Sequence, residues 1–209
     1  LNGSKMFISG GMRADYYTVV ARTGGPGPDG LALFLVEKGR PGFTQTKLEK
    51  MGWHMSDTAA LYFDDVEIPY ENIIGPEDNG FVAVVHNLNA ERIGMSAGML
   101  AYARCAVDEA HAWAKQRVTF GKPLIKRELW QHKFVNMYTK VEMAQAFVDK
   151  CVDAYNTDKY EKQGNVSMET VKLISMAKIV AGELVAEVMD TCLQFHGGWG
   201  YVEEYPIAR

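Results

Sequence analysis

Hydrophobic and polar residues alternate in short runs over the first third of the chain. The runs are rich in β-branched and aromatic residues, a composition that favours β-strands, and they cover residues 4–10, 15–23, 31–38 and 59–69. Segments rich in glycine, proline and aspartate lie between them and predict turns. Because several strands follow one another without a helix, the sequence predicts an antiparallel β-barrel or sandwich domain over residues 1–75.

The pattern changes after residue 80, where hydrophobic residues begin to recur at helical spacing. It predicts three long helices, over residues 81–118, 128–157 and 168–195. Short connections between long helices are typical of an antiparallel helical bundle, here over residues 76–209. The predicted fold class is therefore α+β by segment, with the β-domain first and an incomplete helical bundle second.

Local signals set the expected ends of these helices. Asp78 or Asn79 is suited to cap the first helix at its N-terminus, and Gly121 with Pro123 is suited to stop it. The polar stretch at residues 157–167 predicts a linker between the second and third helices.

The overall composition is that of a folded globular protein, since 47% of the 209 residues are hydrophobic and 23% are charged. The net charge of −4 and the lack of any lysine or arginine run argue against a nucleic-acid partner. No apolar stretch has the length needed to span a bilayer. The chain opens in what reads as the middle of a strand and closes without a cap or tail, so we expect a piece of a longer protein.

Three cysteines, Cys105, Cys151 and Cys192, lie far apart within apolar helical patterns. Their odd number and wide spacing predict reduced core residues rather than disulfides or metal ligands, and hence a reducing compartment. Short signatures of common nucleotide and metal sites, such as the P-loop, HExxH and CxxC, do not occur in the sequence, so no metal is predicted.

The segment "NLNAERIGMSAGM" places one carboxylate and one guanidinium among small and apolar residues. Ala90, Gly94 and Gly98 recur at every fourth position and form a nearly bare row on one helix face. Such a row can serve the close packing of two helices, and a Glu–Arg pair is most often solvated. Here, however, Arg92 falls on the apolar stripe and Glu91 borders the glycine row, so we expect neither on the polar side of the helix. Charges at such positions are costly unless they are paired or functional.

Two further segments stand out, although each alone is explained as a helix end. In "LQFHGGWGYVEEYP" the pair Gly197–Gly198 is suited to a C-cap, and Gly200 adds a third position at which a ligand can approach the backbone closely. "QRVTFGKPL" places Arg117, a hydroxyl and an aromatic residue at the exit of the first long helix.

Five motifs follow one another along the chain: "KMFISGG", "MGWHMSDTAALYFDDVEIP", "LNAERIG", "KQRVTFGKPL" and "LQFHGGWGYVEEYPIAR". In this order they resemble the acyl-CoA dehydrogenase family, flavoenzymes of fatty-acid and branched-chain oxidation, and most of all its long-chain branch. The resemblance covers essentially the whole chain. It implies a middle β-domain followed by three helices of a C-terminal four-helix bundle, without the N-terminal helical domain and the extreme C-terminus of the family.

The resemblance implies an FAD-dependent oxidoreductase of β-oxidation that converts a long- or branched-chain acyl-CoA thioester to a trans-2-enoyl-CoA. It also implies a homotetramer or dimer, electron-transfer flavoprotein as the electron acceptor, and a location in the bacterial cytoplasm or, in a eukaryote, the mitochondrial matrix. Two alternatives stay open. A related oxidase would pass the electrons to oxygen, and a non-catalytic family member would act as a binding or assembly factor.

By the same resemblance, Glu91 is the base that removes the substrate α-proton while the β-hydride passes to flavin N5. Most branches hold this base in a C-terminal segment that is absent from this sequence. The long-chain and isovaleryl branches place it directly before an arginine, as in "NAERI". Asn89, Ala90 and Arg92 match substrate-contacting positions.

The resemblance also assigns FAD-contacting positions to three parts of the chain. They are Phe7, Ile8 and Ser9 on the first strand, Arg117, Phe120 and Glu128 after the first long helix, and Gln194, Phe195, His196, Gly197 and Gly198 at the end of the third. Arg117 and Phe120 match residues that reach the FAD of a neighbouring subunit. Relatives have a glutamine where this chain has Glu128, so a carboxylate there needs Arg127 or another donor to offset its charge.

Overall fold

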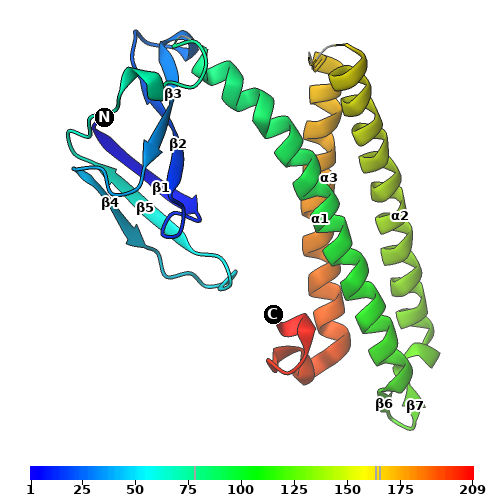
Figure 1. Cartoon of the computed structure of the whole chain (residues 1–209). Helices are drawn as coiled ribbons and strands as arrows, with labels where there is room; N and C mark the ends of the chain where they lie inside the picture. The colour runs from blue at the N-terminus through cyan, green and yellow to red at the C-terminus, as the bar shows by residue number, and fades with distance from the viewer. Residues whose placement is uncertain (78, 163, 165) are drawn as a thin grey trace. The chain divides into compact units, whose positions relative to one another are not determined.

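The computed structural model describes residues 1–77, 79–162, 164 and 166–209. The chain divides into two compact units, Leu1–Val85 and His86–Arg209. The longer strands lie in the first unit, and the helical bundle lies in the second (Figure 1). The first unit extends past residue 75 because Gly80 lies against a strand, where an added Cβ would come within 2.7 Å of the Leu31 carbonyl oxygen. The domain boundary between residues 75 and 76 stays a prediction.

Five strands form two antiparallel sheets in the first unit. One sheet has the order β1 (Gly3–Ser9), β5 (Thr58–Phe63) and β4 (Phe43–Lys47), and the other pairs β2 (Tyr16–Arg22) with β3 (Leu31–Glu37). The antiparallel β-domain is thereby confirmed. Over the described ranges the two sheets do not close into a barrel.

Two details of this unit differ from the prediction. Strand β4, with the sequence FTQTK, lies outside the predicted strands because it buries only Phe43 and pairs only with β5 among the described residues. Strand β5 ends at Phe63, earlier than expected, because Asp64 and Asp65 turn the chain, with Asp65 at φ 49°.

The core of the first unit is formed by side chains from both sheets. Phe43 stacks on Phe63 with 4.9 Å between the ring centroids. The buried Tyr17 places its hydroxyl within this core, where it donates to the Gly11 carbonyl oxygen at 2.8 Å and accepts from Gln45 Nε2 at 2.7 Å. Burial raises the pKa of the Tyr17 hydroxyl, so it stays a neutral donor.

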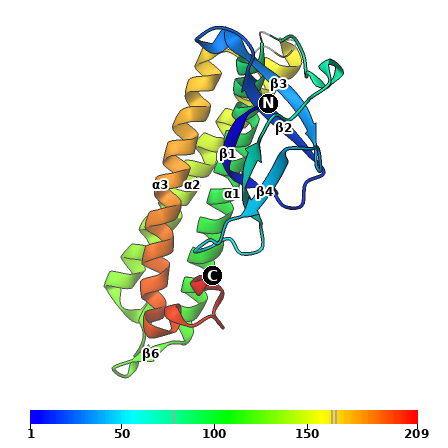
Figure 2. The same ribbon diagram turned by 90° about the vertical axis from the view of Figure 1, so that its left-hand side faces the viewer.

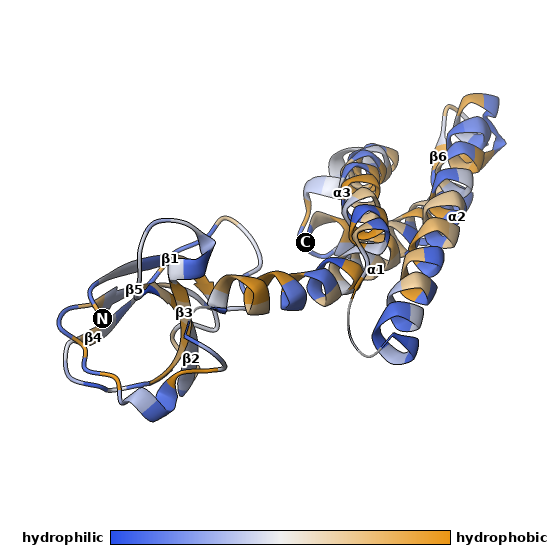
Figure 3. Cartoon of the chain, turned by 90° about the horizontal axis from the view of Figure 1, so that it is seen from above, coloured by the Kyte–Doolittle hydropathy of each residue, from blue (hydrophilic) through white to orange (hydrophobic). Residues whose placement is uncertain are grey.

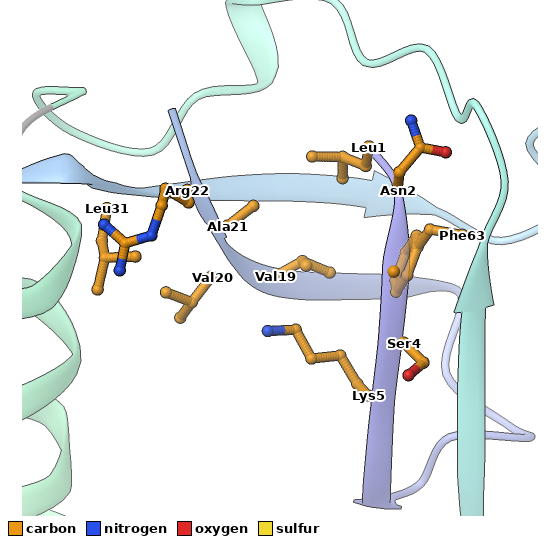
Figure 4. A pocket seen from close by; sticks show the side chains of 11 residues that line it. Leu1, Asn2, Ser4, Lys5, Val19, Val20, Ala21, Arg22, Leu31 and Phe63 are labelled. Carbon is orange, nitrogen blue, oxygen red and sulfur yellow. The ribbon is translucent and has the colours of Figure 1, made fainter. Parts of the chain in front are cut away.

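A groove of about 310 Å³ lies between β1 and β2, which are not paired with each other in the described chain (Figure 4). Figure 4 shows Val19, Val20 and Phe63 beside the basic side chains of Lys5 and Arg22. Arg22 is already engaged, because its Nη1 donates to the Gly25 carbonyl oxygen at 2.6 Å. None of the predicted site residues lines this groove.

Three long helices, α1 (Gly80–Gln116), α2 (Glu128–Asn156) and α3 (Met168–His196), form the bundle. Their predicted ends are confirmed to within two residues. Figure 1 and Figure 2 show α2 and α3 side by side, and Lys140 Nζ of α2 donates to Glu187 Oε1 of α3 at 2.5 Å. Figure 3 shows hydrophobic and hydrophilic residues interleaved along each helix, as expected when one face is buried.

The bundle core takes residues from all three helices, and each helix buries one stripe at helical spacing. Buried members include Leu100 and Val107 of α1, Val141 of α2, and Ala181 and Val188 of α3. None of the described helices combines the length and apolar character needed to cross a bilayer.

Short elements complete the chain. They are the 3₁₀ turns Pro28–Gly30, Tyr70–Asn72, Leu124–Lys126, Gly197–Tyr201 and Pro206–Ala208, the π-helical turn Thr157–Glu161, and the two-residue strands β6 (Val118–Thr119) and β7 (Lys122–Pro123). Asn79 directly precedes α1, and its carbonyl oxygen accepts from the Ala83 backbone N–H at 3.1 Å. Asp78, the other predicted cap, lies outside the described residues.

The described part of the connection between α2 and α3 differs from the predicted polar linker in that it buries a carboxylate. Asp158, in the π-helical turn, is buried and accepts hydrogen bonds from Lys162 Nζ at 2.6 Å and from the Ser167 backbone N–H at 2.7 Å. These donors, Lys162 first, hold the pKa of Asp158 well below its usual range. Ser167 in turn caps α3 by accepting from the Thr170 backbone N–H.

The cysteines divide into two groups. Cys151 and Cys192 are buried in the bundle core, as predicted. Cys105 is exposed, so the expectation of a core position is wrong for this residue. The helical pattern misleads here because α1 carries apolar residues on an exposed face as well as on its buried one.

Candidate active site

The strand with the predicted flavin contacts carries a local distortion. The pairing register of β1 with β5 shifts between Lys5 and Ile8, and Phe7 lies in this bulge at φ 61° with 76% of its surface exposed. A bulky side chain at positive φ costs about 1–3 kcal/mol, and such strain clusters at functional sites. The bulge turns the Phe7 ring outward, where it is available for a flat ligand.

The turn after this strand is held by a carboxylate. Asp57 accepts from the Met12 backbone N–H at 2.7 Å and from Arg13 Nε at 2.6 Å. The Met12 N–H, followed by Arg13, lowers the pKa of Asp57. The neighbouring Ile8 and Ser9 line a groove of about 360 Å³. The predicted flavin-contacting serine thus lies at the end of β1, paired with Thr58 of β5, directly before a turn that Asp57 holds in place.

A second strained aromatic residue marks the connection after α1. Phe120 at φ 50° and Gly121 at φ 74° form the two-residue turn between β6 and β7. Positive φ at both positions defines a type I′ turn, which normally takes asparagine before the glycine. Phe120 lies at the tip of this hairpin and is 99% exposed. Arg117, also exposed, precedes the hairpin, and its carbonyl oxygen accepts from the Leu124 backbone N–H at 2.9 Å.

The guanidinium of Arg127 contacts this hairpin and not the carboxylate of Glu128. Its Nη2 donates to the Thr119 carbonyl oxygen at 2.5 Å, and its guanidinium lies 5.7 Å from the centre of the Phe120 ring. Glu128, the first residue of α2, is exposed and lies 3.6 Å from Nε2 of His132. The guanidinium of Arg127 is used by the hairpin, so of the two predicted possibilities the other one stays, in which another donor, here His132, lies near the Glu128 carboxylate.

Replacing Phe120 by glycine distinguishes the effect of this residue on stability from the proposed contact of its ring with the flavin cofactor. Phe120→Gly should relieve roughly 1–2 kcal/mol of left-handed strain and lose a cation–π contact of about 0.5–1 kcal/mol. We therefore expect little change in unfolding free energy but a clear loss of bound flavin from the full-length protein, measured by absorbance after gel filtration. Tyr160→Ala, which removes another exposed ring, should retain the flavin. Full flavin occupancy in Phe120→Gly would contradict a cofactor role for the ring.

The predicted cofactor segment at the end of α3 divides into buried and exposed residues. Gly197 caps the helix at φ 58°, as predicted, while Gln194 and Gly198 are exposed. The rings of Phe195 and His196 are buried instead. Phe195 stacks on Phe134 with 4.3 Å between ring centroids. A ligand at this helix end therefore meets Gln194 and glycine backbone, while the two rings support that surface from below.

Three helix ends meet at this place. Trp113 Nε1, in the last turn of α1, donates to the Phe195 carbonyl oxygen at 3.1 Å. Trp130, in the first turn of α2, lies 4.5 Å from the Phe195 ring, centroid to centroid. His196 stacks on Trp113 and contacts the Cys192 carbonyl oxygen through Nδ1 at 2.9 Å. The structure thereby brings the hairpin with Phe120 and the segment Gln194–Gly198 to the same end of the bundle, as Figure 1 also shows.

The sequence predicts a position away from the polar side of the helix for Glu91, and the structure shows this residue exposed on one face of α1. The residues on this face are small or apolar rather than polar. Helical spacing places Gly94, Met95, Gly98 and Tyr102 on the same side as Glu91, and we refer to these five residues as the Glu91 face. Met95 and Tyr102 are about half exposed. Space is open at Gly94 and Gly98, since a Cβ on either would meet no described heavy atom within 4 Å.

The predicted substrate-contacting neighbours of Glu91 differ in their environment. Arg92 is half-buried and Ala90 is exposed. Asn89 is 3% exposed, and its Oδ1 has no hydrogen-bond partner among the described residues. A buried carbonyl oxygen without a hydrogen-bond partner is uncommon, so this oxygen is available to accept a hydrogen bond from a group outside the described chain.

Sequence reasoning missed Asn87, whose Nδ2 donates to Glu91 Oε1 at 2.5 Å. The spacing of an amide and a carboxylate four residues apart on a predicted helix was the available signal.

The structure does not gather all predicted residues in one place. Positions 91 and 117 are 26 residues apart, roughly 39 Å along a helix at 1.5 Å per residue. Glu91 and the group at the end of the bundle are therefore separate within one chain.

Comparison with known proteins identifies the two units of the chain. The model of the acyl-CoA dehydrogenase middle domain matches residues 1–66, and that of the acyl-CoA dehydrogenase C-terminal domain matches residues 78–209. The long-chain specific acyl-CoA dehydrogenase of Sus scrofa is 38% identical over 213 residues, which cover 100% of this chain and 47% of that protein. The short-chain specific enzyme of Megasphaera elsdenii is 41% identical over 211 residues, which cover 100% of this chain and 53% of that protein.

Solved structures agree with these matches. Butyryl-CoA dehydrogenase from Megasphaera elsdenii has a TM-score of 0.88 at 40% identity, covering 100% of this chain and 52% of that one. An acyl-CoA dehydrogenase from Geobacillus kaustophilus has a TM-score of 0.91 at 34% identity, covering 100% and 53%. The chain thus spans about half the length of these relatives. Its fold is acyl-CoA dehydrogenase-like, and the chain belongs to the acyl-CoA dehydrogenase family.

Proposed function

We propose that the full-length protein is an FAD-dependent acyl-CoA dehydrogenase that oxidises the Cα–Cβ bond of an acyl-CoA thioester to a trans-2-enoyl-CoA, with Glu91 as the α-proton base. One observation carries the proposal. The carboxylate of Glu91 stands beside an exposed, uncharged helix face whose two glycines leave open space. A thioester and its apolar chain need such a surface next to the base, because a charged neighbour would be costly to desolvate.

The Glu91 face supports a substrate with an extended apolar chain. Beyond Glu91, as far as Tyr102, it carries no charged residue, and the next acidic residue on this side is Glu109. Eleven residues of helix separate Glu91 from Tyr102, which corresponds to roughly 16 Å. We propose a long- or branched-chain acyl group on this basis. The similar identities to long-chain and short-chain relatives do not choose between them.

The residues present fit FAD as the cofactor. Phe7 and Phe120 hold exposed rings at positive φ, and the end of α3 presents glycine backbone with open space above Gly198. Rings suit the flat parts of a dinucleotide, while backbone N–H groups of a glycine-rich turn and Arg117 suit its phosphates. When bound, FAD supplies the acceptor for the hydride that leaves Cβ.

The chain's own part in the reaction is proton removal and binding. Glu91 is placed to take the α-proton on its carboxylate, which has no neighbouring charge on the Glu91 face to neutralise it. We propose that Asn89 and Arg92 hold the polar part of the substrate, and the unpartnered Oδ1 of Asn89 is the feature that favours this role. Ala90 leaves room beside the base.

We further propose assembly into a homotetramer or dimer, with electron-transfer flavoprotein as the electron acceptor. The separation between Glu91 and the hairpin with Phe120 supports assembly, because that hairpin can then complete the site of a neighbouring subunit. The location in a bacterial cytoplasm or a mitochondrial matrix stays a proposal that follows from the family alone.

The test is anaerobic mixing of the full-length, FAD-loaded protein with acyl-CoAs of increasing chain length. We expect the flavin absorbance band to bleach, with the fastest bleaching for long or branched chains. An oxidase would instead consume oxygen steadily without an added electron acceptor. The absence of bleaching with every chain length would favour a non-catalytic family member and contradict the proposal.

A further inference from the structure

A second polar side chain on α1 is in direct contact with Glu91. Asn87, one helical turn earlier, donates from Nδ2 to Oε1 of Glu91, with 2.5 Å between the two atoms. The nitrogen must be the contacting atom, since the amide oxygen and the carboxylate oxygen are both acceptors. Both side chains lie on the exposed side of the helix, so the bond is made at the surface that the substrate would approach.

Helix stability is a poor explanation for this contact. An exposed pair of this spacing contributes little to a helix, and asparagine is itself a weaker helix former than alanine or glutamine. Gly94 and Gly98 weaken the same stretch further. The sequence around Glu91 therefore has low helix propensity at several positions. The hydrogen bond from Asn87 to Glu91 is better explained by its effect on the Glu91 carboxylate.

A restrained carboxylate is what a general base requires. A glutamate side chain has three rotatable bonds, and without a partner its carboxylate samples several orientations. A hydrogen bond to Oε1 fixes the carboxylate while its other oxygen, Oε2, can face the substrate proton. A lysine or arginine at position 87 would also hold the carboxylate, but its charge would compete with the incoming proton. A neutral amide holds it without that competition.

We propose that Asn87 is a positioning residue for Glu91, whose amide N–H orients the carboxylate to accept the substrate α-proton. The inference rests on the proposed function, in which Glu91 is the base. It adds a residue that does not itself touch the reacting atoms and acts through the base alone.

The test compares variants of the full-length, FAD-loaded enzyme in steady-state turnover of a long-chain acyl-CoA with an added electron acceptor, and in anaerobic bleaching of the flavin by the same acyl-CoA. Asn87→Leu removes the donor, and we expect kcat to fall about tenfold, the effect of losing one hydrogen bond to a charged group. KM should stay within about twofold, because the substrate contacts are unchanged. Asn87→Gln keeps an N–H donor and should recover most of the rate.

The chain offers a matched control. Gln145 Nε2 of α2 donates to Asp149 Oδ1 at 2.8 Å, an amide–carboxylate pair of the same spacing away from the Glu91 face. Gln145→Leu should leave kcat unchanged. In a Glu91→Gln background, Asn87→Leu should have no further effect on rate, since the group it positions is gone.

The outcomes separate this inference from the proposed function. If Glu91→Gln is inactive while Asn87→Leu keeps the wild-type kcat, the positioning role is overturned and the base assignment stands. A rise in KM alone, or a loss of rate that Gln145→Leu shares, also overturns the positioning role. If Glu91→Gln bleaches as fast as wild type, the proposed base itself is wrong, whatever Asn87→Leu does.

Discussion

Glu91→Gln should slow the bleaching of bound flavin by a long-chain acyl-CoA by about 10² to 10⁴, the usual loss when a general base is removed. The amide is nearly the same size as the carboxylate but cannot accept a proton at neutral pH. The side chain is exposed on α1, so the substitution should leave the fold and the bound FAD unchanged. Stopped-flow absorbance of the anaerobic full-length enzyme measures the effect directly.

Glu109 provides the control for this experiment. It is also exposed on α1 and lies on the same side of the helix, 18 residues beyond Glu91. Glu109→Gln makes the same chemical change without touching the proposed site, and its bleaching rate should equal that of wild type. Wild-type bleaching by Glu91→Gln would place the base in another part of the protein, and the proposed likeness to the long-chain branch would fall with it.

Phe195→Ala should destabilise the protein by about 3–5 kcal/mol, the usual cost of removing a buried aromatic ring. The ring is 2% exposed and packs against Phe134 and Trp130, where α2 and α3 meet. Urea unfolding of the full-length apoprotein measures this loss without any contribution from the cofactor. Phe195→Leu, which keeps most of the buried volume, should lose much less.

For the adjacent Gln194 we expect a substitution to affect the retention of FAD rather than the stability of the fold. Its side chain is exposed, so Gln194→Ala should leave the stability of the apoprotein nearly unchanged and reduce the retention of FAD. Together the two variants divide the predicted cofactor segment into a residue that supports the surface and one that forms it. If Phe195→Ala left stability unchanged but released FAD, the ring would have to be assigned to the cofactor rather than to the core.

The helices could be predicted from the sequence because each buries a regular stripe, and most of the strands because their runs of β-branched and aromatic residues lie between turn signals. Strand β4 escaped prediction because a strand at the edge of a sheet needs only one buried residue, here Phe43. The connection between α2 and α3 reads as polar, yet its Asp158 is buried and bonded. Polarity alone does not show whether a carboxylate faces water or the end of a helix.

The candidate site was predictable in its residue types and less so in its geometry. The row of small residues beside Glu91 was visible in the sequence, but the open space beside it follows only from the fold. The positive φ angles of Phe7 and Phe120 could not be predicted, because neither residue favours that conformation. Burial of the Phe195 and His196 rings depends on contacts with Trp130 and Trp113 from distant parts of the chain.

The exposure of Cys105 has a practical consequence for spectroscopy. Burial raises the pKa of Cys192 to about 12 and also raises that of Cys151, so neither thiol forms the reactive thiolate readily at neutral pH. A maleimide dye should therefore attach to Cys105, on the same side of α1 as Glu91 and roughly 21 Å further along the helix axis. The native sequence thus supplies a single attachment point for a fluorescent reporter on this helix, without any engineered cysteine.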